Sequence, residues 1–341
     1  MSRPAVLLIY TGGTIGMWAD PRTGALRPMD LAHLEEQVPE LARVGTDLGS
    51  VAFEVPLDSS DMRPADWARI ARMVGEAYDR YDGFVVLHGS DTMAYTASAL
   101  SFLLEGLGKP VVLTGSQLPI GTIRTDAKEN LITAIEIAAA KDEQGHAMVP
   151  EVAVYFEYRL MRGNRTVKVH AERFEAFRSP NYPALAEAGV HLRYDRSAIR
   201  PCPSGPLKVH AAVDDAVAVI WMFPGIRGDD VRHALERPGL RAAVLATFGS
   251  GNAPTDPGLI AALRAARDRG IVLLNVTQCV GGRVEQGRYA TSRALAGMGV
   301  VPCGDMTVEA AITKAMCLLG RAPDGLEAAM SLDLAGEITV A

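Results

Sequence analysis

Short apolar runs, each the length of a β-strand, recur along this chain between segments with helical periodicity. The run Ala5–Tyr10 is apolar throughout, and the runs Phe84–Leu87 and Val111–Thr114 repeat the pattern. Because strands without polar alternation are buried on both faces, they are typical of parallel sheets covered by helices. Helices between the strands also predict right-handed crossovers, which bring the carboxyl ends of the strands to one edge of the sheet.

The length of the chain and a proline-rich stretch indicate two domains. With 341 residues the chain is longer than one typical hydrophobic core requires. Residues 191–212 contain three prolines and have the composition of a linker, and a second strand–helix series begins at Ala216. We therefore expect an α/β protein with domains at residues 1–190 and 213–341, each a mainly parallel sheet flanked by helices.

Composition argues against several classes of protein. The net charge of −6 offers no basic surface for nucleic acid. No apolar stretch is long enough to span a bilayer, and the residues before the first glycines are too few for a signal peptide. The four cysteines are scattered and lack the CxxC spacing of zinc sites. We expect a cytoplasmic protein that needs no metal and binds neither nucleic acid nor membranes.

Three polar loops follow predicted strands and carry small hydroxyl residues. Thr14 comes after Gly12-Gly13 at the end of the first strand, and Ser59 follows a later strand. Ser90 and Asp91 come directly after the strand that ends at Leu87. Loops at the carboxyl ends of parallel strands are where ligands bind in open α/β sheets. We expect these side chains to lie close together.

Together with Lys168, these side chains suit acyl transfer. A threonine hydroxyl can attack a carbonyl carbon if another group accepts its proton. A free lysine, with a pKa of ~10.4, is a poor base at neutral pH, but a buried lysine beside a hydroxyl and an acid can relay protons. Asp91 could instead bind a substrate ammonium or cap the next helix, and Lys168 alone would be interpreted as a solvated lysine.

Two segments together resemble the paired signatures of the bacterial-type L-asparaginase family, and its cytoplasmic type I branch is the nearest. They are Thr11-Gly12-Gly13-Thr14-Ile15 and His88-Gly89-Ser90-Asp91-Thr92. Further matching segments occur in the right order over essentially the whole chain: Asp58–Met62, Arg162–Lys168, Gly251–Pro254 and Met306–Lys314.

The resemblance implies an amidohydrolase that converts L-asparagine to L-aspartate and ammonia without a cofactor or metal. It implies that Thr14 forms the acyl-enzyme. Ser90, Asp91 and Lys168 would form a second cluster of hydroxyl, acid and lysine across the substrate.

The resemblance also implies the substrate contacts and the assembly. Ser59 would bind the α-carboxylate and Asp91 the α-amino group, and Ser60 and Ser90 are also expected to bind substrate. In this family a larger N-terminal domain, flavodoxin-like or Rossmann-like, carries these residues. A smaller C-terminal domain from a neighbouring subunit closes the site, and Asn252 is the candidate for that contact. We therefore expect a homodimer or a homotetramer.

Three features differ from the family pattern. Ser90 stands where the family normally has threonine. Many members carry a tyrosine on a flap over the site, where this chain has Ala25 and Leu26. Cooperative members have an arginine at the position of Ala246 and a threonine at that of Val167. The first two differences bear on rate and substrate preference, and the third bears on allostery.

Other functions stay open at this point. The substrate could be glutamine, D-asparagine or the amide of a misacylated tRNA, although the acidic charge balance argues against tRNA. The chain could also be an inactive relative that senses amino acids. Against that hypothesis, a sensor needs neither the nucleophile Thr14 nor the relay through Lys168.

Overall fold

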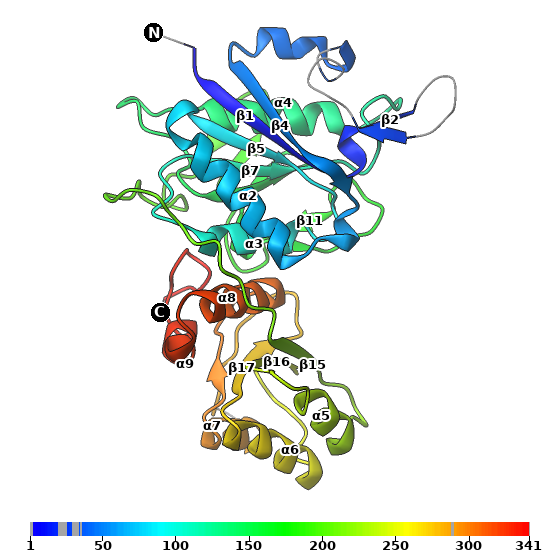
Figure 1. Ribbon diagram of the computed structural model, residues 1–341, viewed down its shortest axis with the longest axis vertical. Coiled ribbons are helices and arrows are strands. Elements are labelled where there is room, and N and C mark those ends of the chain that lie inside the picture. Colours follow the sequence, from blue (N-terminus) through cyan, green and yellow to red (C-terminus); the bar gives the residue numbers. More distant parts are fainter. Residues whose placement is uncertain (1–2, 20–25, 29–33, 35, 288–289, 341) are drawn as a thin grey trace. The chain divides into compact units, whose positions relative to one another are not determined.

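The computed structural model describes residues 3–19, 26–28, 34, 36–287 and 290–340 (Figure 1). The chain divides into two compact units, one ending at Ala211 and the other beginning at Ala212. Among the described residues, no helix combines the length and the apolar character that crossing a membrane requires.

A mixed sheet organises the first unit, and in the described part of the chain it has eight strands. Its parallel strands are, in order across the sheet, β4 (Asp47–Leu57), β1 (Ala5–Gly12), β5 (Gly83–Leu87), β7 (Val111–Thr114) and β8 (Val152–Phe156). The sheet continues with the antiparallel strands β9 (Arg159–Arg162), β12 (Ala186–Ala188) and β13 (Leu192–Tyr194). Strands β5, β7 and β8 are buried along their whole length, which confirms the predicted helix-covered parallel sheet.

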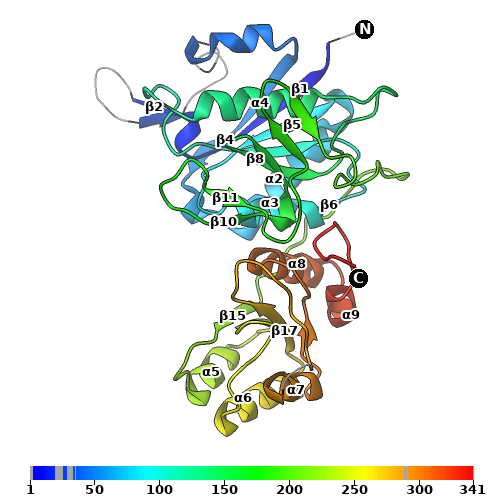
Figure 2. The same ribbon diagram turned by 180° about the vertical axis from the view of Figure 1, so that it is seen from behind.

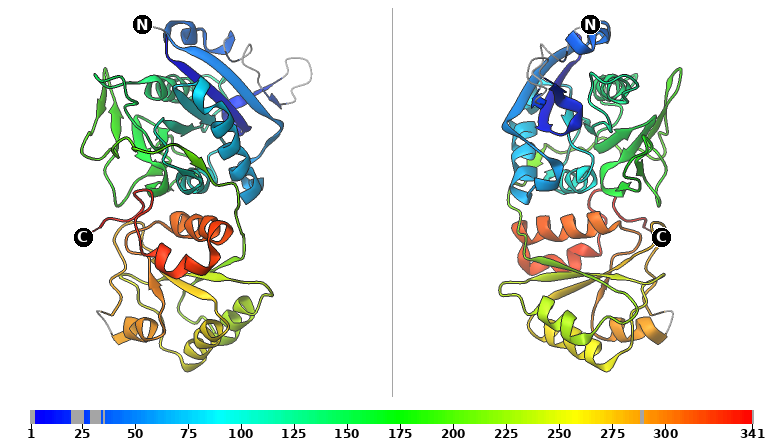
Figure 3. Two further views of the ribbon diagram at one scale, coloured as in Figure 1. Left: turned by 60° about the vertical axis from the view of Figure 1, so that its left-hand side comes forward. Right: turned by 90° about the vertical axis from the view of Figure 1, so that its right-hand side faces the viewer.

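Helices cover both faces of this sheet (Figures 1 and 3). On one face, α4 (Ala127–Ala139) packs Leu131 and Ile135 into the same core as Val6 and Leu8 of β1. The other face carries α2 (Pro64–Ala77) and α3 (Met93–Leu103). Most residues of α3 are buried, as expected for a central helix. Figure 2 shows the short hairpin of β10 (Val167–Lys168) and β11 (Phe177–Arg178), which carries the candidate lysine.

The segment 191–212, predicted as a linker, belongs in part to the sheets of the first unit. Strand β13 pairs with β12 at one edge of the large sheet, and β14 (Lys208–Val209) pairs with β6 (Leu104–Glu105). Leu192 and Tyr194 are partly buried against the core and alternate with charged residues. Such short strands give a weak sequence pattern, whereas the three prolines between β13 and β14 give the segment the composition of a linker.

The second unit is a smaller parallel sheet flanked by helices. Its described strands are β15 (Val217–Trp221), β16 (Ala242–Thr247), β17 (Val272–Thr277) and β18 (Val301–Pro302), in that order. Its helices are α5 (Gly228–Leu235), α6 (Pro257–Asp268), α7 (Ala290–Gly297), α8 (Val308–Arg321) and α9 (Leu326–Met330). Helices α5 and α6 share one core with β15 and β16, as the second strand–helix series predicts.

Glycines allow the loops after β1, β4 and β5 to touch. Gly13 has a φ of 85°, and a Cβ there would lie 2.4 Å from the backbone nitrogen of Gly89. A Cβ on Gly89 would in turn lie 2.6 Å from Oγ of Ser59. Real Cβ atoms do not approach other atoms so closely, so only glycine fits at both positions.

We predict that Gly13→Ala destabilises the protein by at least about 3 kcal/mol, because alanine meets both an unfavourable φ and the Gly89 backbone. Gly145→Ala is the matched control: Gly145 has the same φ of 85°, and its Cβ would have nothing within 4 Å. It should cost only about 1–2 kcal/mol. Urea unfolding of both variants measures the difference. Equal losses would show that the contact with Gly89 does not constrain the fold.

Candidate active site

Thr14 begins a single-turn helix, η1 (Thr14–Gly16), directly after Gly12, the last residue of β1, and Gly13. Ile15 is fully buried, and Gly16 lies so close to the ring of Tyr10 that a Cβ there would come within 2.2 Å of it. Thr14 itself is exposed. The buried residues Ile15 and Gly16 thus fix the backbone at Thr14, whose side chain is exposed to solvent.

The loop after β4 forms another single turn, η3 (Ser59–Asp61), which Asp58 caps. The Asp58 carboxylate accepts hydrogen bonds from the backbone nitrogen of Ser60 at 2.9 Å and from its hydroxyl at 2.8 Å. These two bonds lower the pKa of Asp58. Ser60, which we expected to bind substrate, is exposed and donates its hydroxyl to Asp58.

Ser59 joins this loop to the loop after β5. Its side chain is buried, and its Oγ accepts a hydrogen bond from the backbone nitrogen of Asp91 at 3.3 Å. Its carbonyl oxygen accepts a second bond from the Thr92 hydroxyl at 2.6 Å. Because Ser59 Oγ acts as an acceptor toward Asp91, its own proton can be donated to a ligand.

The structure brings Ser90, Asp91 and Lys168 together. Nζ of Lys168 lies 2.8 Å from Oγ of Ser90 and 2.6 Å from Oδ1 of Asp91. The Lys168 side chain is 17% exposed and that of Asp91 is 64% exposed, so the lysine is enclosed while the carboxylate faces solvent. Helix α3 takes Thr92 as its N-cap residue, and the Asp91 carboxylate pairs with Lys168. The alternatives of a helix-capping Asp91 and a solvated Lys168 are therefore disfavoured.

A buried polar segment delivers Lys168 to this cluster. Arg162 is buried. Its Nε donates a hydrogen bond to the Glu151 carboxylate at 2.6 Å, and its guanidinium donates another to the carbonyl oxygen of Ala198 at 2.8 Å. Its guanidinium lies 4.3 Å from the centre of the Tyr182 ring. The single turn η5 (Gly163–Arg165) that follows is also buried. The sequence pattern indicated a tight polar turn there but not that its charged residues are buried.

His88 was not among the predicted site residues, yet it supports the loop that carries them. It is fully buried, with Nδ1 2.7 Å from the carbonyl of Gly89 and Nε2 2.9 Å from Oγ1 of Thr96. A carbonyl can only accept, so Nδ1 carries the proton and Nε2 accepts the threonine hydroxyl. Burial lowers the pKa of His88 to about 4, against a smaller opposite effect of the Gly89 bond. The signal that could have found it is its position at the end of a buried strand.

Gln117 is a second side chain that sequence reasoning did not assign to the site. It lies near the start of the loop that follows β7, and its Oε1 is 3.4 Å from Oγ of Ser90. Glutamine after a strand is common in loops, so its type alone carried no signal.

Two further expectations concern other parts of the chain. Asn252 lies in the second unit, where its carbonyl oxygen accepts a hydrogen bond from the Phe248 backbone at 2.8 Å. The flap position Ala25 lies outside the described residues, and the flanking strands β2 (Met17–Ala19) and β3 (Leu26–Pro28) pair antiparallel. In the described part of the chain, no group of three or more His, Cys, Asp and Glu side chains could hold a metal ion.

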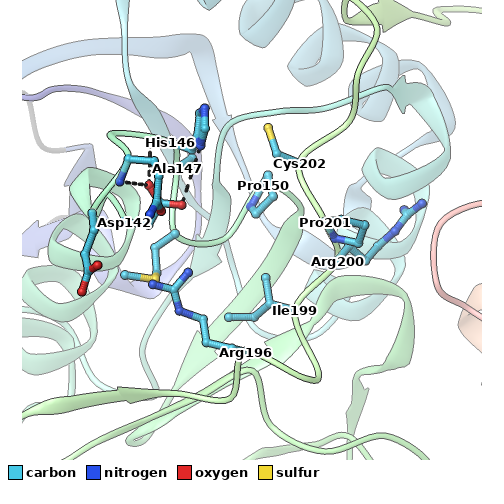
Figure 4. Close-up of a pocket in the computed structure, with 12 residues that line it drawn as sticks. Asp142, His146, Ala147, Pro150, Arg196, Ile199, Arg200, Pro201 and Cys202 are labelled. Atoms are coloured by element: carbon cyan, nitrogen blue, oxygen red, sulfur yellow. Dashed lines mark hydrogen bonds and ion pairs between the residues drawn. The ribbon is translucent and has the colours of Figure 1, made fainter.

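A groove of about 800 Å³ lies elsewhere in the first unit (Figure 4). Its lining residues include Asp142 and His146 from the loop before β8, and Arg196 and Cys202 from the segment after β13. These segments lie at the amino end of β8, whereas Thr14 and its partners follow carboxyl ends of the parallel strands. The groove is therefore separate from the candidate active site.

The buried His88 predicts a loss of stability in acid. The unfolded chain takes up a proton near pH 6.5, but folded His88 does so only near pH 4, so the unfolded state binds more protons in between. The free energy of unfolding should therefore fall by about 3 kcal/mol as the pH drops from 7 to 4. Urea unfolding of wild type and His88→Gln at several pH values between 7 and 4 isolates the contribution of His88. A free energy of unfolding that falls equally with pH in both proteins would refute it.

Comparison with known proteins identifies the family of this chain. The family models "Asparaginase, N-terminal" and "Glutaminase/Asparaginase C-terminal domain" match residues 5–200 and 216–329. L-asparaginase 1 of Escherichia coli K12 is 45% identical, with 99% of each chain covered. L-asparaginase I of Vibrio cholerae is 42% identical with a TM-score of 0.88, covering 99% of this chain and 100% of that one. The Thermococcus kodakarensis enzyme is 33% identical with a TM-score of 0.90 and the same coverage. This chain belongs to the asparaginase family.

Proposed function

We propose that this protein hydrolyses L-asparagine to L-aspartate and ammonia through a covalent intermediate on Thr14. The observation that carries the proposal is the enclosed Lys168, which contacts Ser90 and Asp91 on a loop packed against the Thr14 loop. The E. coli relative named L-asparaginase 1, identical at 45% of positions, supports the same reaction.

In the first half of the reaction, the Thr14 hydroxyl oxygen attacks the carbon of the side-chain amide. A tetrahedral intermediate forms, and its negative oxygen is stabilised by backbone N–H groups of the glycine-containing loops. Its collapse breaks the C–N bond and releases ammonia. One proton leaves Thr14 and one is gained by the leaving nitrogen, so the chemistry needs a carrier for a single proton.

The cluster of Ser90, Asp91 and Lys168 is suited to carry that proton. Lys168 donates to Oγ of Ser90, so the Ser90 proton can pass to the leaving nitrogen as a lysine proton replaces it. The proton lost by Thr14 then restores Lys168 to its charged form. Asp91 balances the charge of Lys168 at 2.6 Å. In the second half, water attacks the ester carbon and the C–O bond to Thr14 breaks. The proton lost by water passes through the same groups to the Thr14 oxygen, which regenerates Thr14 and frees aspartate.

Two side chains are suited to bind the ends of the amino acid. Asp91 is 64% exposed and its Oδ1 is paired with Lys168, so its other carboxylate oxygen can accept hydrogen bonds from a substrate ammonium. Ser59 accepts a bond from the Asp91 backbone, and its hydroxyl proton can be donated to a carboxylate. Ser60 can join it by rotating away from Asp58, to which it donates in the free protein.

We propose further that the protein works in the cytoplasm as a homodimer or homotetramer in which a neighbouring subunit contributes Asn252. An apolar stripe on the second unit supports association. Val219, Trp221 and Phe223 alternate along the edge strand β15 and the residues after it, and they are 44%, 53% and 50% exposed. Exposed apolar residues in a row on an edge strand favour a protein interface.

Trp221→Arg should weaken this association, because it places a charge in the centre of the stripe. Light scattering over a range of protein concentrations should show a shift to smaller species. Val190→Arg, at a residue 95% exposed in the first unit, is the control and should leave the mass unchanged. An unchanged mass for Trp221→Arg would exclude the stripe as an interface.

Thr14→Ala should lower kcat by at least ~10³ because it removes the nucleophile. Thr14 is exposed, so the melting temperature should stay close to that of wild type. Thr14→Ser keeps the hydroxyl and should retain much more activity than the alanine variant. Ammonia release from L-asparagine measures all three proteins. More than a few per cent of wild-type turnover in Thr14→Ala would rule out this nucleophile.

A further inference from the structure

Gln117 contacts both parts of the proposed proton relay. Its Oε1 lies 3.4 Å from Oγ of Ser90. Its Nε2 donates to the carbonyls of Ala171 at 3.0 Å and Arg173 at 2.9 Å. These two residues lie between β10 and β11, in the hairpin that carries Lys168. One amide therefore connects the Ser90 loop to the segment that holds the lysine.

The orientation of this amide follows from its partners. The carbonyls of Ala171 and Arg173 can only accept hydrogen bonds, so the NH₂ group of Gln117 must face them. Its oxygen is thereby turned toward Ser90. In the free protein Lys168 donates to Oγ of Ser90, and Ser90 in turn donates its own proton to the Gln117 oxygen. The hydroxyl is held from two sides.

The backbone of Gln117 is anchored as well. Its N–H donates to both carboxylate oxygens of Asp126, at 2.9 and 3.1 Å, and Leu118 donates to the same group at 3.2 Å. Asp126 is buried immediately before α4, and Asn130 of that helix donates to the carbonyl of Gly115 at 3.0 Å. These hydrogen bonds attach the loop to α4 and fix the backbone position from which the Gln117 side chain extends.

We propose that Gln117 is a positioning residue that fixes the rotamer of Ser90. Threonine has a second heavy atom on Cβ that restricts χ1, whereas serine has none and can turn its hydroxyl more freely. The hydrogen bond to Gln117 restricts χ1 of Ser90 in place of the absent methyl group and keeps Oγ of Ser90 within hydrogen-bond distance of Lys168. The inference rests on the proposed function, because it assigns Gln117 to the proton relay of that reaction.

A double-mutant cycle tests this role. Gln117→Met keeps the size of the side chain and removes its hydrogen bonds. In the wild-type background it should lower kcat by roughly fivefold, the effect of releasing one rotamer, with little change in KM. In the Ser90→Thr background the same substitution should lower kcat by less than about twofold, because threonine is already restricted. Gln144→Met, at an exposed glutamine in the groove of Figure 4, is the matched control and should leave kcat unchanged.

The comparison between backgrounds separates positioning from a general structural role. A residue that only shaped its loop would lower kcat equally with Ser90 and with Thr at that position, and this result would overturn the inference. An unchanged kcat in Gln117→Met would also overturn it. If that variant does not fold, Gln117→Asn keeps the amide but is too short to span Ser90 and the hairpin, and it should show the same dependence on background. A wild type inactive on L-asparagine would instead refute the proposed function and this inference with it.

Discussion

The contact between the backbones of Gly13 and Gly89 is the constraint on which the candidate site depends. It brings the loop after β1 against the loop after β5, and Gly89 in turn packs against Ser59. Three hydroxyl residues distant in sequence thereby gather at one edge of the sheet. Any side chain at either glycine would separate these loops and move Thr14 away from Ser90 and Asp91.

Rigid support surrounds this contact and leaves the reacting groups open. Thr14 is followed by the fully buried Ile15. The loop of Ser90 is supported by His88, a buried neutral histidine whose two ring nitrogens form hydrogen bonds with Gly89 and Thr96. Lys168 follows a buried segment in which Arg162 pairs with Glu151. Groups held in this way keep their geometry without reorganising during the reaction, which is how preorganised sites stabilise developing charge.

The sequence predicted the fold well because its signals are local. Apolar runs without alternation predicted the buried parallel strands, and the loops after them predicted where polar groups would gather. Long-range partners were harder to predict: Lys168 lies 78 residues from Ser90, and the chemistry of the two side chains suggested a relay although no local pattern placed them together. Gln117 was missed because its partners Ser90, Ala171 and Arg173 lie on other loops. His88 was missed because the sequence does not show that its ring is buried and bonded to Gly89 and Thr96. Strand β13, within residues 191–212, was not predicted because an edge strand of three residues leaves almost no pattern.

The central claim is that Thr14 carries the acyl group during hydrolysis, and trapping that intermediate tests it most directly. Rapid acid quenching during turnover of L-asparagine, followed by digestion and mass spectrometry, would locate any covalent adduct. Our account predicts an aspartyl ester on the peptide containing Thr14, present only while substrate remains. An adduct on the peptide containing Ser90, or no adduct during the same turnovers, would contradict it.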